Sequence, residues 1–217
     1  MMRRNENRYR RWPFVVGALF VFAAAALYGF NRLEDSIAGQ QAGAVLTEFH
    51  EQISATEVAD GYHPYGLAVE QYVPDYMLNP DMEMPTVPID GKPYVGSLYF
   101  PALELALPVM SGWSYPDLKI APCLYAGSIY RNDAVIAAHN YTSHFGRLAE
   151  LSPGDLVQFT DVDGNVFTYE VAVQEVLDPR AREEMIASGF DLSLFTCTRG
   201  GVARFTLRCR LLSVPIG

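Results

Sequence analysis

The chain has 217 residues, half of them hydrophobic, and a formal net charge of −9 at pH 7. The charge is unevenly divided, because residues 1–30 carry five arginines and one glutamate, a net of +4, and the remainder therefore carries −13. This acidic remainder excludes the nucleic-acid-binding classes, which need a basic face.

The beginning of the chain has the pattern of a membrane anchor. Residues 1–12 form a basic tail, and residues 13–30 contain no charged side chain. In a helix these 18 residues would span about 27 Å, close to the ~30 Å hydrocarbon core of a bilayer. Because the arginines precede the apolar stretch, we expect a single-pass protein with its N-terminus in the cytoplasm and its remaining residues outside the cell. The alternative, a cleaved signal peptide, usually has a shorter apolar core of ~7–15 residues.

Residues 31–92 are expected to form an extracellular stalk and connector. Up to residue 56 the hydrophobic side chains recur at helical spacing, which predicts a helical stalk. That stripe consists of Leu33, Ile37, Leu46, Phe49 and Ile53. Residues 57–92 hold five prolines and four tyrosines without clear periodicity, which is typical of an irregular connector.

Residues 93–217 are expected to form one mainly β domain. Short hydrophobic runs with turn signals between them follow one another closely, and about eight strands with short helices fit a single all-β barrel or sandwich. The main helical insert is expected at residues 180–188. The expected strands are 94–100, 103–108, 134–138, 156–160 and 166–176, with a final pair inside 191–212.

The turn DVDGN at residues 161–165 joins two of these strands. It begins like a calcium-binding loop, but its glycine is at the fourth position and no glutamate stands at the twelfth. We therefore interpret it as a turn and expect neither a metal site nor an organic cofactor.

The last two strands bring a cysteine close to a row of arginines. Cys197 ends the first strand, and Arg204 begins the second after a Gly-Gly sequence that we interpret as a tight turn. A thiol near a fixed cation ionises more easily and becomes a nucleophile, and a guanidinium can stabilise an oxyanion. The plain alternative is a small hydrophobic residue packed at a strand end.

The three cysteines are an odd number, so at least one thiol stays free in an exported chain. Cys209 falls on the hydrophobic face of its strand, and Cys123 has no periodic neighbours. These two could form a disulfide, and Cys197 is the thiol that we expect to be free.

His139 follows the hydrophobic run 134–138 and precedes Asn140, so it is expected at a strand end on the rim of the sheet. A single histidine is more often an ordinary surface residue. However, Cys197, His139 and Arg204 at strand ends of one small β domain could together perform acyl transfer.

Four stretches of the segment from 94 to 212 form a recognisable series: YVGSLYFPALELALPV, VIAAHN, LAELSPGDLVQFTDVDGNVFTYEV and LSLFTCT. In these stretches and in their order, the segment resembles the sortases, membrane-anchored cysteine transpeptidases of Gram-positive bacteria. Ala138 stands where that family usually has glycine, and Ser193 where it often has threonine, but neither change removes a reacting group.

The resemblance implies a closed sortase-like β-barrel and a set of residue roles. Cys197 would be the nucleophile, His139 the acid that protonates the leaving amine, and Arg204 the residue that holds the substrate and the oxyanion. Thr196, through its backbone, and Asn140 would contact the substrate.

The resemblance also implies the reaction. An LPXTG-like sorting signal on a surface protein or pilin would be cleaved through a thioester and joined to an amine of a cell-wall precursor or a pilin lysine. Two alternatives stay open: a peptide hydrolase of the same fold, and a cell-surface binding module without catalysis. We also hypothesise that residues 57–92 cover part of the substrate groove.

Overall fold

The structure is a computed structural model that describes residues 12–60 and 73–213. Contacts within the chain divide it into two compact units, Met1–Ile37 and Ala38–Gly217. The arginines of the basic tail lie outside the described residues.

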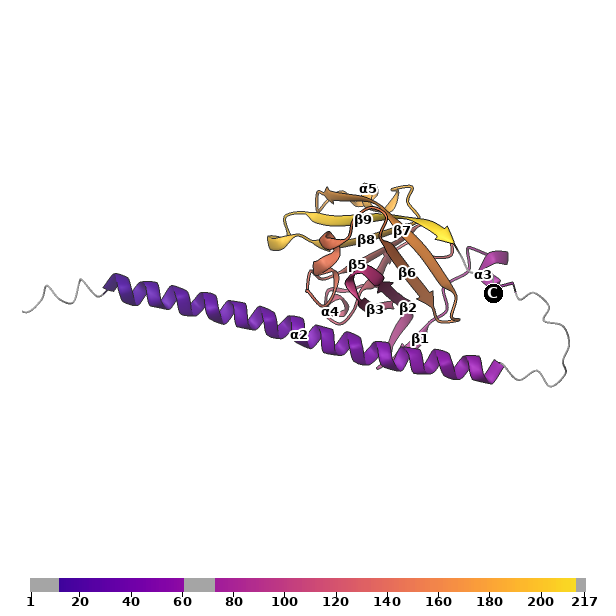
Figure 1. The fold of residues 1–217 in the computed structure, drawn as a ribbon, viewed down its shortest axis with the longest axis horizontal. Helices are drawn as coiled ribbons and strands as arrows, with labels where there is room; N and C mark the ends of the chain where they lie inside the picture. Colours follow the sequence, from indigo (N-terminus) through magenta and orange to yellow (C-terminus); the bar gives the residue numbers. More distant parts are fainter. Residues whose placement is uncertain (1–11, 61–72, 214–217) are drawn as a thin grey trace, which may run out of the picture. The chain divides into compact units, whose positions relative to one another are not determined.

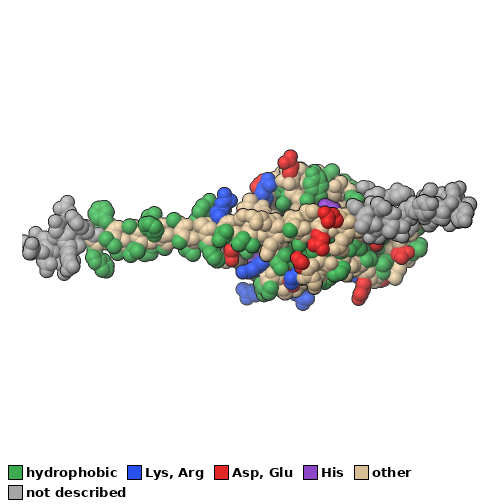
Figure 2. Space-filling view, turned by 90° about the horizontal axis from the view of Figure 1, so that it is seen from below, with side chains coloured by type: hydrophobic (Ala, Val, Ile, Leu, Met, Phe, Trp, Pro, Cys, Tyr) green, Lys and Arg blue, Asp and Glu red, His purple; other side chains and the backbone are tan. Residues whose placement is uncertain are grey.

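Helix α2 (Trp12–Asp60) runs without a break through both the expected anchor and the expected stalk (Figure 1). Nearly all side chains of its first part are exposed and hydrophobic, and Figure 2 shows hydrophobic side chains along it. Within Trp12–Ile53, the most hydrophobic stretch of 18 residues has a mean hydropathy of 2.0. By length and composition this helix could therefore cross a membrane.

From Ala38 onward, α2 packs against the β domain through side chains three or four residues apart. Of the stripe predicted from the sequence, Phe49 and Ile53 are buried, whereas Leu33 and Ile37 are exposed. Small residues replace them at the contact. A Cβ atom at Gly39 would lie 2.9 Å from Cβ of Ser143, so glycine permits this close approach. The buried stripe consists of Ala38, Ala42, Val45, Phe49 and Ile53.

The expected irregular connector is wrong for its first residues, because α2 continues through residues 57–60. In residues 73–91, helix α3 (Asp75–Leu78) and strand β1 (Val87–Ile89) follow. The ring of Tyr76 stacks on that of Tyr130 with centroids 4.6 Å apart and lies 5.2 Å from the ring of Phe167. The tyrosine-rich and proline-rich composition therefore belongs, in these residues, to a segment that packs on the main core. Residues 61–72 lie outside the described residues.

Eight strands close into a mixed barrel, and β1 adds a ninth strand at its edge, which confirms the expected fold. The order is β1-β2-β3-β4-β5-β8-β9-β7-β6, with β2 also paired to β6. The pairs β3–β4 and β5–β8 are parallel, and the other pairs are antiparallel. The barrel strands are β2 (Lys92–Phe100), β3 (Leu105–Met110), β4 (Cys123–Ala126), β5 (Ala134–Ala138), β6 (Leu156–Asp161), β7 (Val166–Leu177), β8 (Leu192–Cys197) and β9 (Arg204–Ser213).

Short helices occupy the connections, as expected. The insert predicted at 180–188 is observed as α5, which precedes the cysteine strand. The connecting helices are η1 (Pro101–Leu103), α4 (Tyr115–Leu118), η2 (Phe145–Glu150), α5 (Arg182–Ile186) and η3 (Arg199–Gly201).

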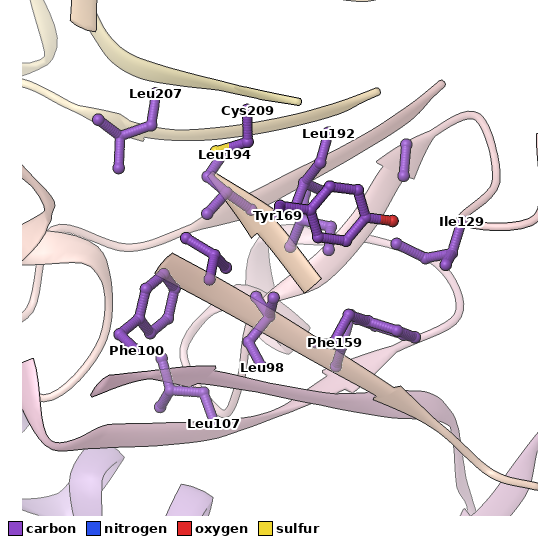
Figure 3. Close-up of a cluster of buried hydrophobic side chains, with 14 of the residues drawn as sticks. Leu98, Phe100, Leu107, Ile129, Phe159, Tyr169, Leu192, Leu194, Leu207 and Cys209 are labelled. Carbon is purple, nitrogen blue, oxygen red and sulfur yellow. The ribbon is translucent and has the colours of Figure 1, made fainter. Parts of the chain in front are cut away.

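The barrel interior is filled by alternate side chains from facing strands (Figure 3). On β8 and β9, Leu194, Leu207 and Cys209 are completely buried, so the hydrophobic face predicted for the last strand does point inward. Each large side chain buried in this way stabilises the fold by roughly 1.5–3 kcal/mol. This rigid interior fixes the register of the two strands that carry the candidate site.

Candidate active site

The side chains of Cys197 and Arg204 lie beside each other at the end of the β8–β9 pair. The two residues are register partners, and Nη1 of Arg204 donates to Sγ of Cys197 at 2.6 Å. Register partners on neighbouring strands share a face because side chains alternate along each strand. The guanidinium therefore lies where it can interact with negative charge on the sulfur, the nucleophilic form of a cysteine.

The connection between these strands is longer than the tight Gly-Gly turn predicted from the sequence. It contains η3, and Gly200 and Gly201 have φ values of +82° and +71°, a region that favours glycine. The loop is closed by the N–H of Thr198, which donates to the carbonyl of Ala203 at 2.9 Å. The predicted tight turn is therefore wrong, because the connection is longer. Cys197 and Arg204 are still neighbours, as expected.

His139 reaches the same end of the sheet from strand β5. Strands β5 and β8 are parallel, and their last register pair is Ala138 with Thr196. His139 and Cys197 are the next residues of the two strands, so the topology places both residues at the same rim of the sheet. The side chain of His139 is half-buried.

A hydrogen bond ties these two strand ends together. Oγ1 of Thr196 donates to the carbonyl oxygen of Ala138 at 2.9 Å, and both residues are buried. The hydroxyl of Thr196 therefore holds the residue before His139 in place, while its backbone remains the group that we expected to face a substrate. Asn140, the other expected substrate contact, is exposed at the rim.

The loop after His139 is fixed by aromatic and backbone contacts that the sequence did not reveal. The ring of Tyr141 lies 5.0 Å from that of His139 and 5.5 Å from that of His144, which is fully buried. The N–H of Phe145 donates to the carbonyl of His139 at 3.2 Å. These contacts limit the positions that the imidazole can take.

An aromatic surface extends outward from Arg204. The guanidinium carbon lies 5.9 Å from the ring centroid of Phe195, which is 5.2 Å from that of Tyr125. Tyr125 is in turn 5.2 Å from Trp113. Phe195 could have been found from the sequence, since it lies two residues before Cys197 on the same strand face, but the other two come from distant segments.

The remaining arginines of β9 have other partners. Arg208 is 2% exposed and donates to the carboxylate of Glu175. Arg210 donates to the carbonyl of Gly189 and lies over the ring of Phe190. Within the described part of the chain, Arg204 is thus the arginine of this strand that contacts the sulfur.

The other two thiols lie away from this rim, and all three cysteines are free, so the disulfide considered between Cys123 and Cys209 is not formed. Both are completely buried, and burial raises the pKa of each to about 12. Their thiolate forms are therefore strongly disfavoured at neutral pH. Cys197 is half-buried, as a nucleophile that meets a substrate has to be.

The DVDGN sequence forms a turn. Oδ1 of Asp161 accepts hydrogen bonds from the N–H groups of Asp163 and Asn165, and Oδ2 accepts from the hydroxyl of Tyr130. Its carboxylate is thereby committed to protein donors. Among residues 12–60 and 73–213, no group of three or more histidine, cysteine, aspartate or glutamate side chains could hold a metal ion.

Comparison with solved structures finds several sortases, of which the sortase D5 transpeptidase described first shares the fold of this chain. A sortase D5 transpeptidase from Clostridium perfringens aligns over 80% of this chain and 99% of its own length, with a TM-score of 0.54 and 15% identity. Sortase C1 from Streptococcus suis aligns over 55% of this chain and 73% of its own, with a TM-score of 0.48 and 25% identity. Sortase E from Streptomyces avermitilis aligns over 56% and 90%, with a TM-score of 0.48 and 24% identity.

Sequence comparison gives the family. No curated protein matches this chain. A family model described as "Sortase domain" matches residues 98–211, more than half of the chain, and this span contains Cys197, His139 and Arg204. The chain therefore belongs to the sortase family, whose members are generally cysteine transpeptidases.

Proposed function

We propose that this sortase is a transpeptidase that uses Cys197 as nucleophile, His139 as acid and base, and Arg204 as the group that stabilises developing negative charge. The observation that carries the proposal is the 2.6 Å contact between the guanidinium of Arg204 and the sulfur of Cys197, at the rim that His139 also reaches. A thiol, an imidazole and a guanidinium at one rim supply the groups that acyl transfer needs.

The first half-reaction releases an amine. The thiolate of Cys197 attacks the carbonyl carbon that follows the threonine of an LPXTG-like sorting signal, and Arg204 interacts with the oxyanion. When the peptide C–N bond breaks, His139 gives its proton to the leaving nitrogen, and a thioester with Cys197 remains.

The second half-reaction forms the new bond. An amine of a cell-wall precursor or a pilin lysine attacks the thioester carbon and passes a proton to His139, the C–S bond breaks, and Cys197 leaves as its thiolate. Tyr125 and the exposed Trp113, which continue the row of rings that begins at Phe195 beside Arg204, offer an apolar surface for the hydrophobic part of the signal. Asn140 and the backbone of Thr196 are the proposed substrate contacts at the rim.

The proposed location follows from the hydrophobic part of α2 and the arginines of residues 1–12. The tail would stay in the cytoplasm, residues 13–30 would span the membrane, and the domain at 93–217 would act outside the cell on surface proteins or pilins. A protease added to intact cells or right-side-out vesicles tests this orientation. It should degrade the domain at residues 93–217, because a protease that cannot cross the membrane reaches only external domains.

Transpeptidation is tested with the full chain in detergent, an LPXTG-like peptide and an added amine such as triglycine. The proposal expects a peptide–amine product that increases with amine concentration and disappears in Cys197→Ala. Release of the free acid regardless of amine would indicate a hydrolase instead. Retention of all activity by Cys197→Ala would indicate a binding module without catalysis.

A further inference from the structure

The side chain of Arg208 is the largest completely buried one in the described residues, and the proposed chemistry does not use it. It lies on the same strand face as Arg204, four residues further along β9 from the rim, where its register partner on β8 is Ser193. A buried cation is costly unless it is fully paired and hydrogen-bonded. Its partners therefore indicate what it is for.

Arg208 binds both side-chain and backbone acceptors. Nε donates to Oε1 of Glu175 at 2.5 Å, and Nη1 donates to Oγ of Ser193 at 2.7 Å. Nη1 also donates to the carbonyl of Met185 at 3.0 Å, and Nη2 donates to the carbonyl of Glu184 at 2.8 Å. The last carbonyls of a helix lack partners within the helix. Arg208 thus fastens the end of α5 to β9.

The side chain that α5 presents to the barrel is Met185, which is 4% exposed. It belongs to one buried cluster with Val135, Ala137 and Phe195. Ala137 lies two residues before His139, and Phe195 two residues before Cys197, on the outer faces of β5 and β8. Met185 therefore covers the sheet surface next to the reacting residues.

We propose that Arg208 is a positioning residue that fixes α5 as one wall of the peptide-binding surface beside Cys197, while the buried Met185 holds the helix against the sheet. The inference rests on the proposed function for its substrate, but not for the attachment of α5. A single guanidinium fork can hold two backbone carbonyls, a hydroxyl and a carboxylate at once, which the ammonium group of lysine cannot reproduce. Without the hydrogen bonds from the Arg208 guanidinium, α5 should move more freely, so the peptide-binding surface beside it should be less well defined. The contact between Cys197 and Arg204 should stay intact.

Two substitutions test the attachment. Arg208→Lys keeps the charge but loses the fork, and Arg208→Met fills the buried space with an apolar chain, which buried ion-pair sites often tolerate. The matched control is Ser193→Ala, which removes one acceptor of the same guanidinium and leaves both α5 carbonyls bound. The full chain in detergent is used throughout. If Arg208→Lys does not fold, Arg208→Met alone tests the attachment of α5.

Hydrogen exchange gives a readout that does not need activity. The amides of Met185 and Ala187 donate to carbonyls within and before α5. We expect exchange in peptides covering 182–188 to accelerate at least about tenfold in Arg208→Met, and less in Arg208→Lys, with β8 unchanged. Unchanged exchange at α5 in a folded Arg208→Met variant would overturn the attachment, whether or not the protein processes any sorting peptide.

Kinetics with an LPXTG-like peptide test the consequence for the substrate. KM should rise by about tenfold in Arg208→Met and in Met185→Ala, while kcat changes by less than about threefold, because the reacting groups are not touched. The rate at which iodoacetamide modifies Cys197 should also stay unchanged. An equal fall in kcat with KM unchanged would overturn a positioning role, whereas no reaction in the unmodified protein would count against the proposed function alone.

Discussion

Arg204 and Cys197 are paired across β8 and β9, with Nη1 and Sγ 2.6 Å apart. The pair forms because the two strands leave the same end of the barrel and keep a common register through the intervening glycine-containing loop. A cation is thereby fixed beside the one cysteine that is not completely buried. This relationship gives the most direct prediction.

Replacing Arg204 by alanine should lower kcat/KM for an LPXTG-like peptide by about 10²–10³-fold, the loss typical of removing one donor to a developing oxyanion. Arg204→Lys should retain part of the activity, since it keeps a charge without the fork. Rates are measured by separating cleaved from intact peptide. Arg210→Ala, an exposed arginine of the same strand, is the control, and activity above half of normal in Arg204→Ala would contradict the assignment.

Thr196→Val should reduce both stability and activity. Valine has nearly the same shape as threonine but cannot donate to the carbonyl of Ala138. Leaving this buried carbonyl without its hydrogen bond should lower the free energy of unfolding by about 1–2 kcal/mol. Because Ala138 precedes His139, the histidine should also be held less firmly. Chemical denaturation and peptide cleavage are compared with Thr196→Ser, which keeps the hydroxyl. Equal stability of the valine and serine variants would show that the hydroxyl contributes nothing.

The protein should lose stability in alkali. Burial raises the pKa of Cys123, Cys209 and Tyr94 to about 12, from ordinary values of 9.0 for the thiols and 10.0 for tyrosine. Between about pH 9 and 12 the unfolded chain has lost these protons while the folded chain still binds them, so the free energy of unfolding falls as pH rises. The slope is up to about 1.4 kcal/mol per pH unit for each group.

Denaturation curves at pH 8, 9 and 10 measure this slope. Cys209→Ala should have a lower starting stability but a shallower fall with pH, because one of the buried groups is gone. A stability that stays constant or increases between pH 9 and 10 would contradict the burial of these thiols in a protonated form.

Phe49→Ala tests whether the second half of α2 belongs to the catalytic unit. Phe49 is completely buried in a cluster with Tyr94 and Cys123, and emptying such a site typically costs about 3–5 kcal/mol. The thermal midpoint of the β domain, followed by near-UV circular dichroism in detergent, should therefore fall. Leu33→Ala, in the exposed part of the same helix, should leave it unchanged. Equal midpoints for both variants would indicate that the helix only tethers the domain.

The sequence predicts the parts of this protein that depend on regular alternation. On β9, leucine and cysteine alternate with arginine, so the strand, its inner face and the neighbour of Cys197 could all be inferred. The sortase motifs then identify His139, whose strand is short and hydrophobic on both faces.

Features made by long-range contacts could not be inferred in this way. Strand β4 has four residues and a register shift, so it shows no period, and Cys123 could not be placed. Helix α2 packs through Ala38 and Ala42, because close approach favours small side chains over the leucines that mark a stripe in the sequence. The attachment of α5 by Arg208 depends on acceptors that are 15 or more residues away.

The most direct measurement is the intact mass of the full chain after brief mixing with an LPXTG-like peptide. We predict an added mass equal to the acyl fragment that ends at threonine, located on Cys197 by peptide mapping, removed by hydroxylamine and absent in Cys197→Ala. Cleavage of the peptide with no such adduct at any time, or with the same adduct on Cys123 or Cys209, would contradict the proposed role of Cys197.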